Sequence, residues 1–98
     1  MLRQISQLEL IAGRAAEFEE ASKPAFALVR AGEGCRDVKL LRSIENPDIY
    51  YVLIEWDSLE HHRRFEAANA SRVLAHIGEL ARHVLSQHFD LVDLGLES

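Results

Sequence analysis

The chain has 98 residues, a formal net charge of −5 and 48% apolar residues, which predicts one globular domain over residues 1–98. The acidic balance, with no basic cluster beyond Arg63–Arg64, argues against a nucleic-acid-binding surface. The single cysteine, Cys35, cannot form an internal disulfide, and no secretory signal opens the chain, so we expect a cytoplasmic protein. No segment approaches the roughly 20 apolar residues that span a bilayer, so no membrane partner is expected.

The first half of the chain is predicted to hold a strand over residues 2–11, a helix over 14–31 and a second strand over 35–44. Pro24 falls inside the helical pattern. An interior proline removes one helical hydrogen bond, so we expect a kink or two shorter helices near that point.

Residues 49–56 are almost all β-formers and predict a third strand. Asn46-Pro47 before it favours a turn, so the strands over 35–44 and 49–56 should form an antiparallel hairpin. The third strand is apolar on both faces, one carrying Tyr50, Val52, Ile54 and Trp56 and the other Ile49, Tyr51 and Leu53. Both faces must therefore be covered.

The second half predicts helices over residues 58–68 and 71–84, interrupted at Asn69–Ala70, then a strand over 85–94 and a tail over 95–98. Asp57 or Ser58 can cap the first of these helices. The order β-α-β-β-α-α-β is the split βαβ pattern of an α+β, ferredoxin-like fold, with an antiparallel sheet and helices on one face. The uncovered apolar face predicts a homodimer that closes into an α+β barrel.

No strong catalytic motif is present, and the histidines are the notable excess. His62 lies between Leu59 and Phe65 on the apolar face of its helix. It is either an imidazole at the edge of the core, satisfied by a backbone partner, or a polar group that points into a cavity between helix and sheet. His76 could approach the same cavity. His76 and His83 lack a nearby third ligand, so no metal site is expected.

Residues 34–65, GCRDVKLLRSIENPDIYYVLIEWDSLEHHRRF, resemble the antibiotic biosynthesis monooxygenase superfamily of dimeric α+β barrels. The Gly-Cys opening, the Asn-Pro turn, Glu55-Trp56 and a histidine six residues after the tryptophan match its pattern. In its oxygenases the resemblance implies a pocket between sheet and helices, whose habitual positions fall on four residues here: Val52, Trp56, His62 and His76. Trp56 is retained, the usual asparagine is replaced by Val52, and two roles would pass to histidines.

The haem-degrading members of this superfamily are less similar. They carry an asparagine where Ser6 stands and a tryptophan where Phe65 stands, and their axial histidine would fall at or next to His76. Two of these three features are missing.

We therefore expect an enzyme that oxidises or isomerises a small apolar or aromatic metabolite without a cofactor. His62 is the expected catalytic base. Trp56 is either core or a pocket wall, and with Val52, Phe65 and His76 it is expected to bind the substrate. The alternatives are a non-catalytic small-molecule binding protein of the same fold, and a haem-binding or haem-degrading protein.

Overall fold

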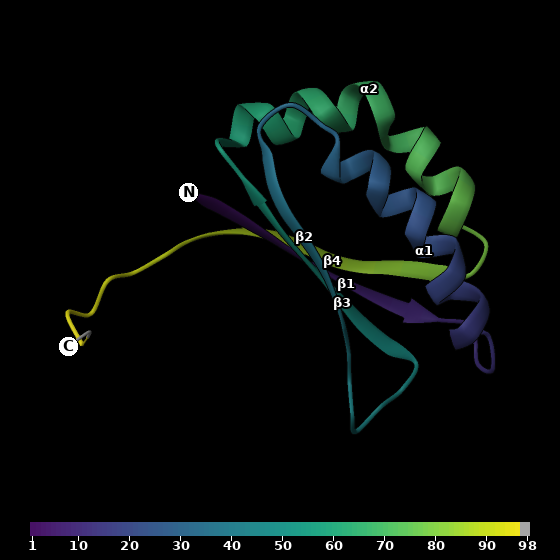
Figure 1. Cartoon of the computed structure of the whole chain (residues 1–98). Helices are drawn as coiled ribbons and strands as arrows, with labels where there is room; N and C mark the ends of the chain where they lie inside the picture. Colours follow the sequence, from purple (N-terminus) through teal and green to yellow (C-terminus); the bar gives the residue numbers. More distant parts are fainter. Residues whose placement is uncertain (97–98) are drawn as a thin grey trace.

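The computed structural model describes residues 1–96, which form a four-stranded sheet and two helices. The elements are β1 (Leu2–Leu10), α1 (Ala15–Arg30), β2 (Cys35–Arg42), β3 (Ile49–Trp56), α2 (Leu59–Ile77) and β4 (Ala81–Asp90). The strands lie in the order β2-β3-β1-β4 and all neighbours are antiparallel. Both helices lie on the same side of the sheet (Figure 1). The predicted ferredoxin-like α+β arrangement is confirmed.

The β2–β3 hairpin is also confirmed, with Leu40 opposite Val52 and Leu41 opposite Tyr51. Its turn is closed by Asn46, whose backbone N–H donates to Ser43 Oγ at 3.0 Å and whose side-chain oxygen accepts from the Asp48 N–H at 3.2 Å. This local side-chain bonding is what favours asparagine in turns.

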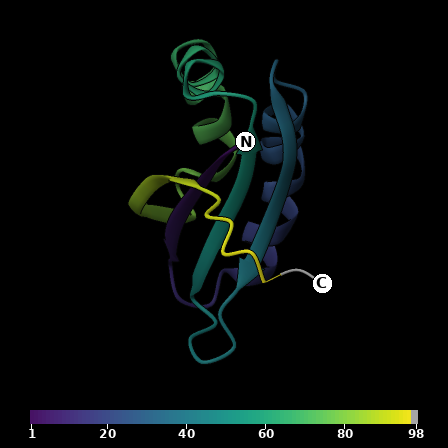
Figure 2. The same cartoon turned by 90° about the vertical axis from the view of Figure 1, so that its left-hand side faces the viewer.

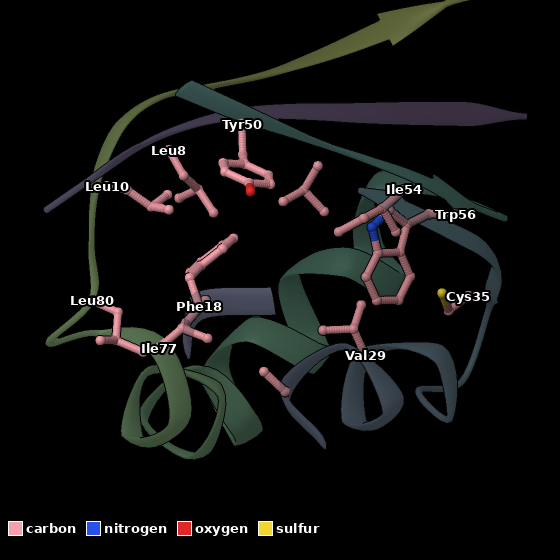
Figure 3. Close-up of a cluster of buried hydrophobic side chains, with 12 residues drawn as sticks. Leu8, Leu10, Phe18, Val29, Cys35, Tyr50, Ile54, Trp56, Ile77 and Leu80 are labelled. Atoms are coloured by element: carbon pink, nitrogen blue, oxygen red, sulfur yellow. The ribbon is translucent and has the colours of Figure 1, made fainter. Parts of the chain in front are cut away.

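The hydrophobic core lies between the sheet and the helices (Figure 3). The inward face of β3 is the predicted one, since Tyr50, Val52, Ile54 and Trp56 are all buried. Phe18 of α1 packs on Tyr50 with ring centroids 5.0 Å apart, and Ala25 and Val29 continue the buried stripe of that helix. Burying these large side chains supplies the main stabilisation of so small a domain.

Three predictions about the bounds of the elements are wrong. α2 is one uninterrupted helix through Asn69–Ala70, because neither residue breaks a helix that packs on α1, and the Asn69 amide donates to the Phe65 carbonyl within it. α2 ends at Ile77 before Gly78, so β4 begins at Ala81 instead of residue 85. α1 likewise stays a single helix across Pro24, so the alternative of two shorter helices is also wrong.

The face of the sheet away from the helices is uncovered and partly apolar. Leu41, Tyr51, Leu85 and Phe89 are exposed there, one from each of β2 and β3 and two from β4. Residues 91–96 leave the sheet on this side (Figures 1 and 2), and the predicted tail ends at residues 97–98, which lie outside the described residues. Neither helix within residues 1–96 is both long enough and apolar enough to span a bilayer.

Candidate functional site

The junction between β3 and α2 fixes the position of His62. Of the two predicted candidates, Ser58 caps α2, and its hydroxyl accepts from the His61 N–H at 3.2 Å. Just before the cap, the Asp57 N–H donates to the Gly34 carbonyl at 2.7 Å, which ties the junction to the start of β2. His62 therefore begins the second turn of a helix anchored at its first residue.

The imidazole of His62 is 7% exposed and contacts three side chains. It stacks on Trp56 with centroids 5.3 Å apart and an interplanar angle of 25°. Its Nδ1 lies 2.7 Å from Nε2 of His88, which belongs to β4. Its Nε2 lies 3.3 Å from a carboxylate oxygen of Glu66, one turn further along α2. The partner is thus another side chain, not the backbone group that one interpretation of the sequence expects.

Burial lowers the pKa of the His62 imidazole below its ordinary value of 6.5, because desolvation disfavours the charged ring. The neighbouring His88 and Arg63 act in the same direction, while Glu66 opposes them. His62 is therefore a neutral imidazole at neutral pH, with one nitrogen protonated and the other bare. A neutral ring of this kind can accept a proton.

A second polar group lies beside Trp56 on the same face of the sheet. The indole N–H of Trp56 donates to Gln4 Oε1 at 3.0 Å, and Gln4 Nε2 donates to Ser6 Oγ at 3.2 Å. The hydroxyls of Ser6 and Ser86 are 3.0 Å apart, and Gln4 Nε2 also reaches Ser86 Oγ at 3.4 Å. β1 and β4 bring these groups together, since Gln4 pairs with His88 and Ser6 with Ser86.

The predicted site residues do not all lie together in the structure. Val52 and Trp56 are buried on the inward face of β3, 3% and 0% exposed. Phe65 is partly buried and packs on Trp56 at 5.6 Å between centroids. His76 is exposed and is not brought to this cluster. It lies fourteen residues after His62, which corresponds to about 21 Å along a helix. The two rings are therefore far apart even where they lie on the same face of α2.

Four members of the cluster were not predicted: Gln4, Ser6, Ser86 and His88. The sequence contains a signal for the first two, because every second residue of a strand faces the same side and Leu8 and Leu10 face the core. For Ser86 and His88 the signal is weaker. Their strand is exposed from Arg82 to Asp90 and gives no apolar alternation that would identify its inward face.

The cluster is open on the side of β4, where Ser86 and His88 are exposed. Toward the core, the rings of Trp56 and His62 are stacked on each other and are 0% and 7% exposed. On the α1 side of α2 a separate hollow of about 190 Å³ is lined by Gly32, Glu33, His61, Arg64, Phe65 and Asn69. Solvent therefore reaches the cluster from the β4 side.

Within residues 1–96, no three His, Cys, Asp or Glu side chains are placed to hold a metal ion. His88 and Glu66 lie on opposite nitrogens of the His62 ring, so these three groups do not converge on one point. The arrangement is instead suited to accepting and moving a proton.

Comparison with known proteins identifies the family of the chain. The sequence model of the family described as Antibiotic biosynthesis monooxygenase matches residues 1–77, well over half of the chain. The chain belongs to this family. The match ends at the last residue of α2, so β4 and its Ser86 and His88 lie beyond it. The matched segment therefore includes the cluster residues of β1, β3 and α2, but not those of β4.

Individual members of the family and of its fold are similar to this chain. The uncharacterized protein YczJ of Bacillus subtilis is 31% identical over 62 residues, 63% of this chain, and the match spans only 65% of the length of YczJ. A crystal structure from Bordetella bronchiseptica assigned to the family has 29% identity and a TM-score of 0.85, covering 93% of this chain and 96% of its own. SnoaB of Streptomyces nogalater, a cofactor-independent oxygenase, shares the fold with a TM-score of 0.84 at 18% identity, covering 98% and 97% of the two chains.

Proposed function

We propose that this protein is a cofactor-independent, monooxygenase-like enzyme that acts on a small apolar or aromatic metabolite. The observation that carries the proposal is the imidazole pair of His62 and His88, whose ring nitrogens are 2.7 Å apart, with His62 stacked on Trp56 and His88 exposed. The fold shared with SnoaB, an oxygenase that needs no cofactor, supports it. Phe65, which packs on Trp56 from α2, and Val52, which is buried on the same face of β3, complete the apolar surroundings.

The chemistry asks little of the protein. An electron-rich phenol that loses its proton becomes a phenolate, which can give an electron to dioxygen directly. One oxygen atom then enters the ring and the other leaves as water, so that a phenol and dioxygen yield a quinone and water. The protein must supply an apolar surface and a base that is unprotonated at the working pH. His62, whose pKa is lowered by burial, is neutral at such a pH, so its pair with His88 can act as the base, and general-base catalysis contributes of order 10²–10⁴-fold to the rate.

The test is oxygen uptake by the purified protein with a panel of electron-rich phenols, without added flavin or metal. We expect uptake that depends on the protein, and a loss of about 10²-fold or more in H62A. Unchanged turnover of a proven substrate by H62A would remove His62 from its role. A Soret band on titration with haem would instead support the haem-handling alternative.

A second candidate is a small-molecule binding protein without catalysis. The full burial of Trp56 and the near-complete burial of His62 favour it, because both rings are held as core residues are. A phenol that raises the melting temperature of the protein without being consumed would decide for binding alone.

We also propose that the protein is a homodimer formed through the uncovered face of the sheet. Tyr51 is 38% exposed there and Leu85 47%, and the two belong to different strands. Apolar patches of several hundred Å² are unusual on a monomer, and a second copy would cover this one. Sedimentation at micromolar concentration should give twice the mass of the chain, and a single species of 11.1 kDa would refute the dimer.

A further inference from the structure

We propose that Glu66, His62 and His88 form a proton relay, and that the atom which takes the proton from the substrate is Nδ1 of His88. This inference rests on the proposed function and names the point of proton transfer within it. His62 then acts as the middle of the relay, not as its entrance.

The positions of the hydrogen atoms follow from the two neighbours of His62. A carboxylate accepts hydrogen bonds and cannot donate them, so Glu66 favours a proton on the nitrogen that faces it, Nε2 of His62. Nδ1 of His62 is then bare and must accept. The hydrogen bond of 2.7 Å at Nδ1 therefore comes from a proton on Nε2 of His88. The opposite tautomer would place a bare nitrogen against the carboxylate.

This assignment leaves Nδ1 of His88 bare. Within residues 1–96 that atom has no hydrogen-bond partner, and His88 is exposed whereas His62 is 7% exposed. Both nitrogens of His62, by contrast, are already engaged by Glu66 and His88. A ligand at the open side of the cluster thus meets an unoccupied basic nitrogen on His88 and none on His62.

The proton transfers balance along this chain. The phenol oxygen gives its proton to Nδ1 of His88, which becomes an imidazolium. The proton on Nε2 of His88 can pass to Nδ1 of His62, and the proton on Nε2 of His62 to Glu66. The phenolate is left with the electron pair of its O–H bond. The two transfers within the protein use contacts already present in the structure, at 2.7 Å and 3.3 Å.

The charged and titratable groups around His62 come from two elements. α2 supplies Glu66 and Arg63, and β4 supplies His88; the β3 neighbour, Trp56, carries no charge. Glu66 is the one group among them that stabilises a positive charge on the relay. Its side chain is 64% exposed, so its effect is screened by solvent and its main role is to select the tautomer.

Nuclear magnetic resonance can test the relay without any substrate. Long-range proton–nitrogen spectra of the ¹⁵N-labelled protein, recorded well above the ordinary histidine pKa of about 6.5, distinguish protonated from bare ring nitrogens. We expect the proton on Nε2 in both His62 and His88. A proton on Nδ1 of His62 would overturn the relay. Because the spectra need no turnover, they decide this point even if no phenol is oxidised.

Kinetics with two substitutions of His88 separate proton transfer from positioning. H88Q keeps an N–H that can donate to His62 but offers no basic nitrogen, whereas H88A removes both. We expect H88Q to lose about 10²-fold or more of turnover, as much as H88A, while H83Q, an exposed position in the same strand, stays at the wild-type rate. If H88Q kept its turnover while H62Q lost it, His62 would be the base and the relay would be wrong, although the proposed function would stand.

Discussion

The hydrogen bond between Gln4 and Trp56 offers a quantitative test of how the site is held. Trp56 is 0% exposed and its indole N–H donates to Gln4 Oε1 at 3.0 Å. W56F removes the donor and leaves the Gln4 oxygen buried without a partner, which costs about 1–3 kcal/mol beyond the lost packing. Q4L leaves the indole N–H buried without a partner, at a similar cost of about 1–3 kcal/mol.

The double variant removes both polar groups, and the bond of 3.0 Å between Ser6 and Ser86 keeps those two hydroxyls satisfied. We therefore expect Q4L/W56F to be less destabilised than the sum of the single variants by about 2 kcal/mol. Replacing a buried polar pair by apolar side chains is tolerated better than removing one partner.

The assay is urea unfolding followed by far-ultraviolet circular dichroism, since Trp56 is the one tryptophan and fluorescence would change with it. Protein concentration is held fixed, so that association does not alter the apparent stability. A control cycle combines Q4L with H83Q. His83 pairs with Leu8, about 13 Å along β1 from Gln4, and should add without coupling. Additivity of Q4L and W56F within about 0.5 kcal/mol would refute the reasoning.

Three further predictions concern stability. Gly34 and Gly13 both have positive φ, +82° and +80°, but a Cβ on Gly34 would collide with the His61 ring while one on Gly13 meets nothing within 4 Å. In urea unfolding, G34A should therefore cost about 2–4 kcal/mol and G13A about 1 kcal/mol. Equal costs for the two variants would exclude the collision. P24A restores an N–H inside α1 and should raise the free energy of unfolding by about 1–3 kcal/mol, and a lower melting temperature would contradict this. Folding lowers the pKa of His62, so the unfolded chain binds the proton more tightly, and the free energy of unfolding should fall as the pH drops below about 6.5. H62Q should flatten that part of the stability–pH curve. An unchanged curve would refute the linkage.

The parts of the fold that local pattern determines could be predicted from the sequence. The strand over residues 49–56 has the predicted bounds and the predicted inward face, because alternation is unambiguous where every residue favours a strand. The interruption predicted at Asn69–Ala70 is wrong for the opposite reason. Asparagine disfavours a helix only weakly, and packing of α2 on α1 outweighs that preference.

The candidate site could be predicted only in part, for a geometric reason. Trp56 and His62 are near in sequence and their adjacency follows from one strand running into one helix. Gln4 reaches Trp56 through the pairing of β1 with β3, and His88 reaches the same place through the pairing of β1 with β4. No local pattern specifies either pairing. The positions of polar residues on a sheet depend on register, and register is set by the partner strand.

Because the site needs the pairing of β1 with β4, the last strand, it can assemble only late during synthesis of the chain. A nascent polypeptide that ends before Ala81 already carries Trp56 and His62, yet it lacks both Ser86 and His88, so synthesis must proceed past β4 before the cluster is complete. The same strand lies at an edge of the sheet and is largely exposed, and such elements open at low free energy. Detachment of this one strand would therefore separate His88 from His62 while the β2–β3 hairpin and α1 remained folded.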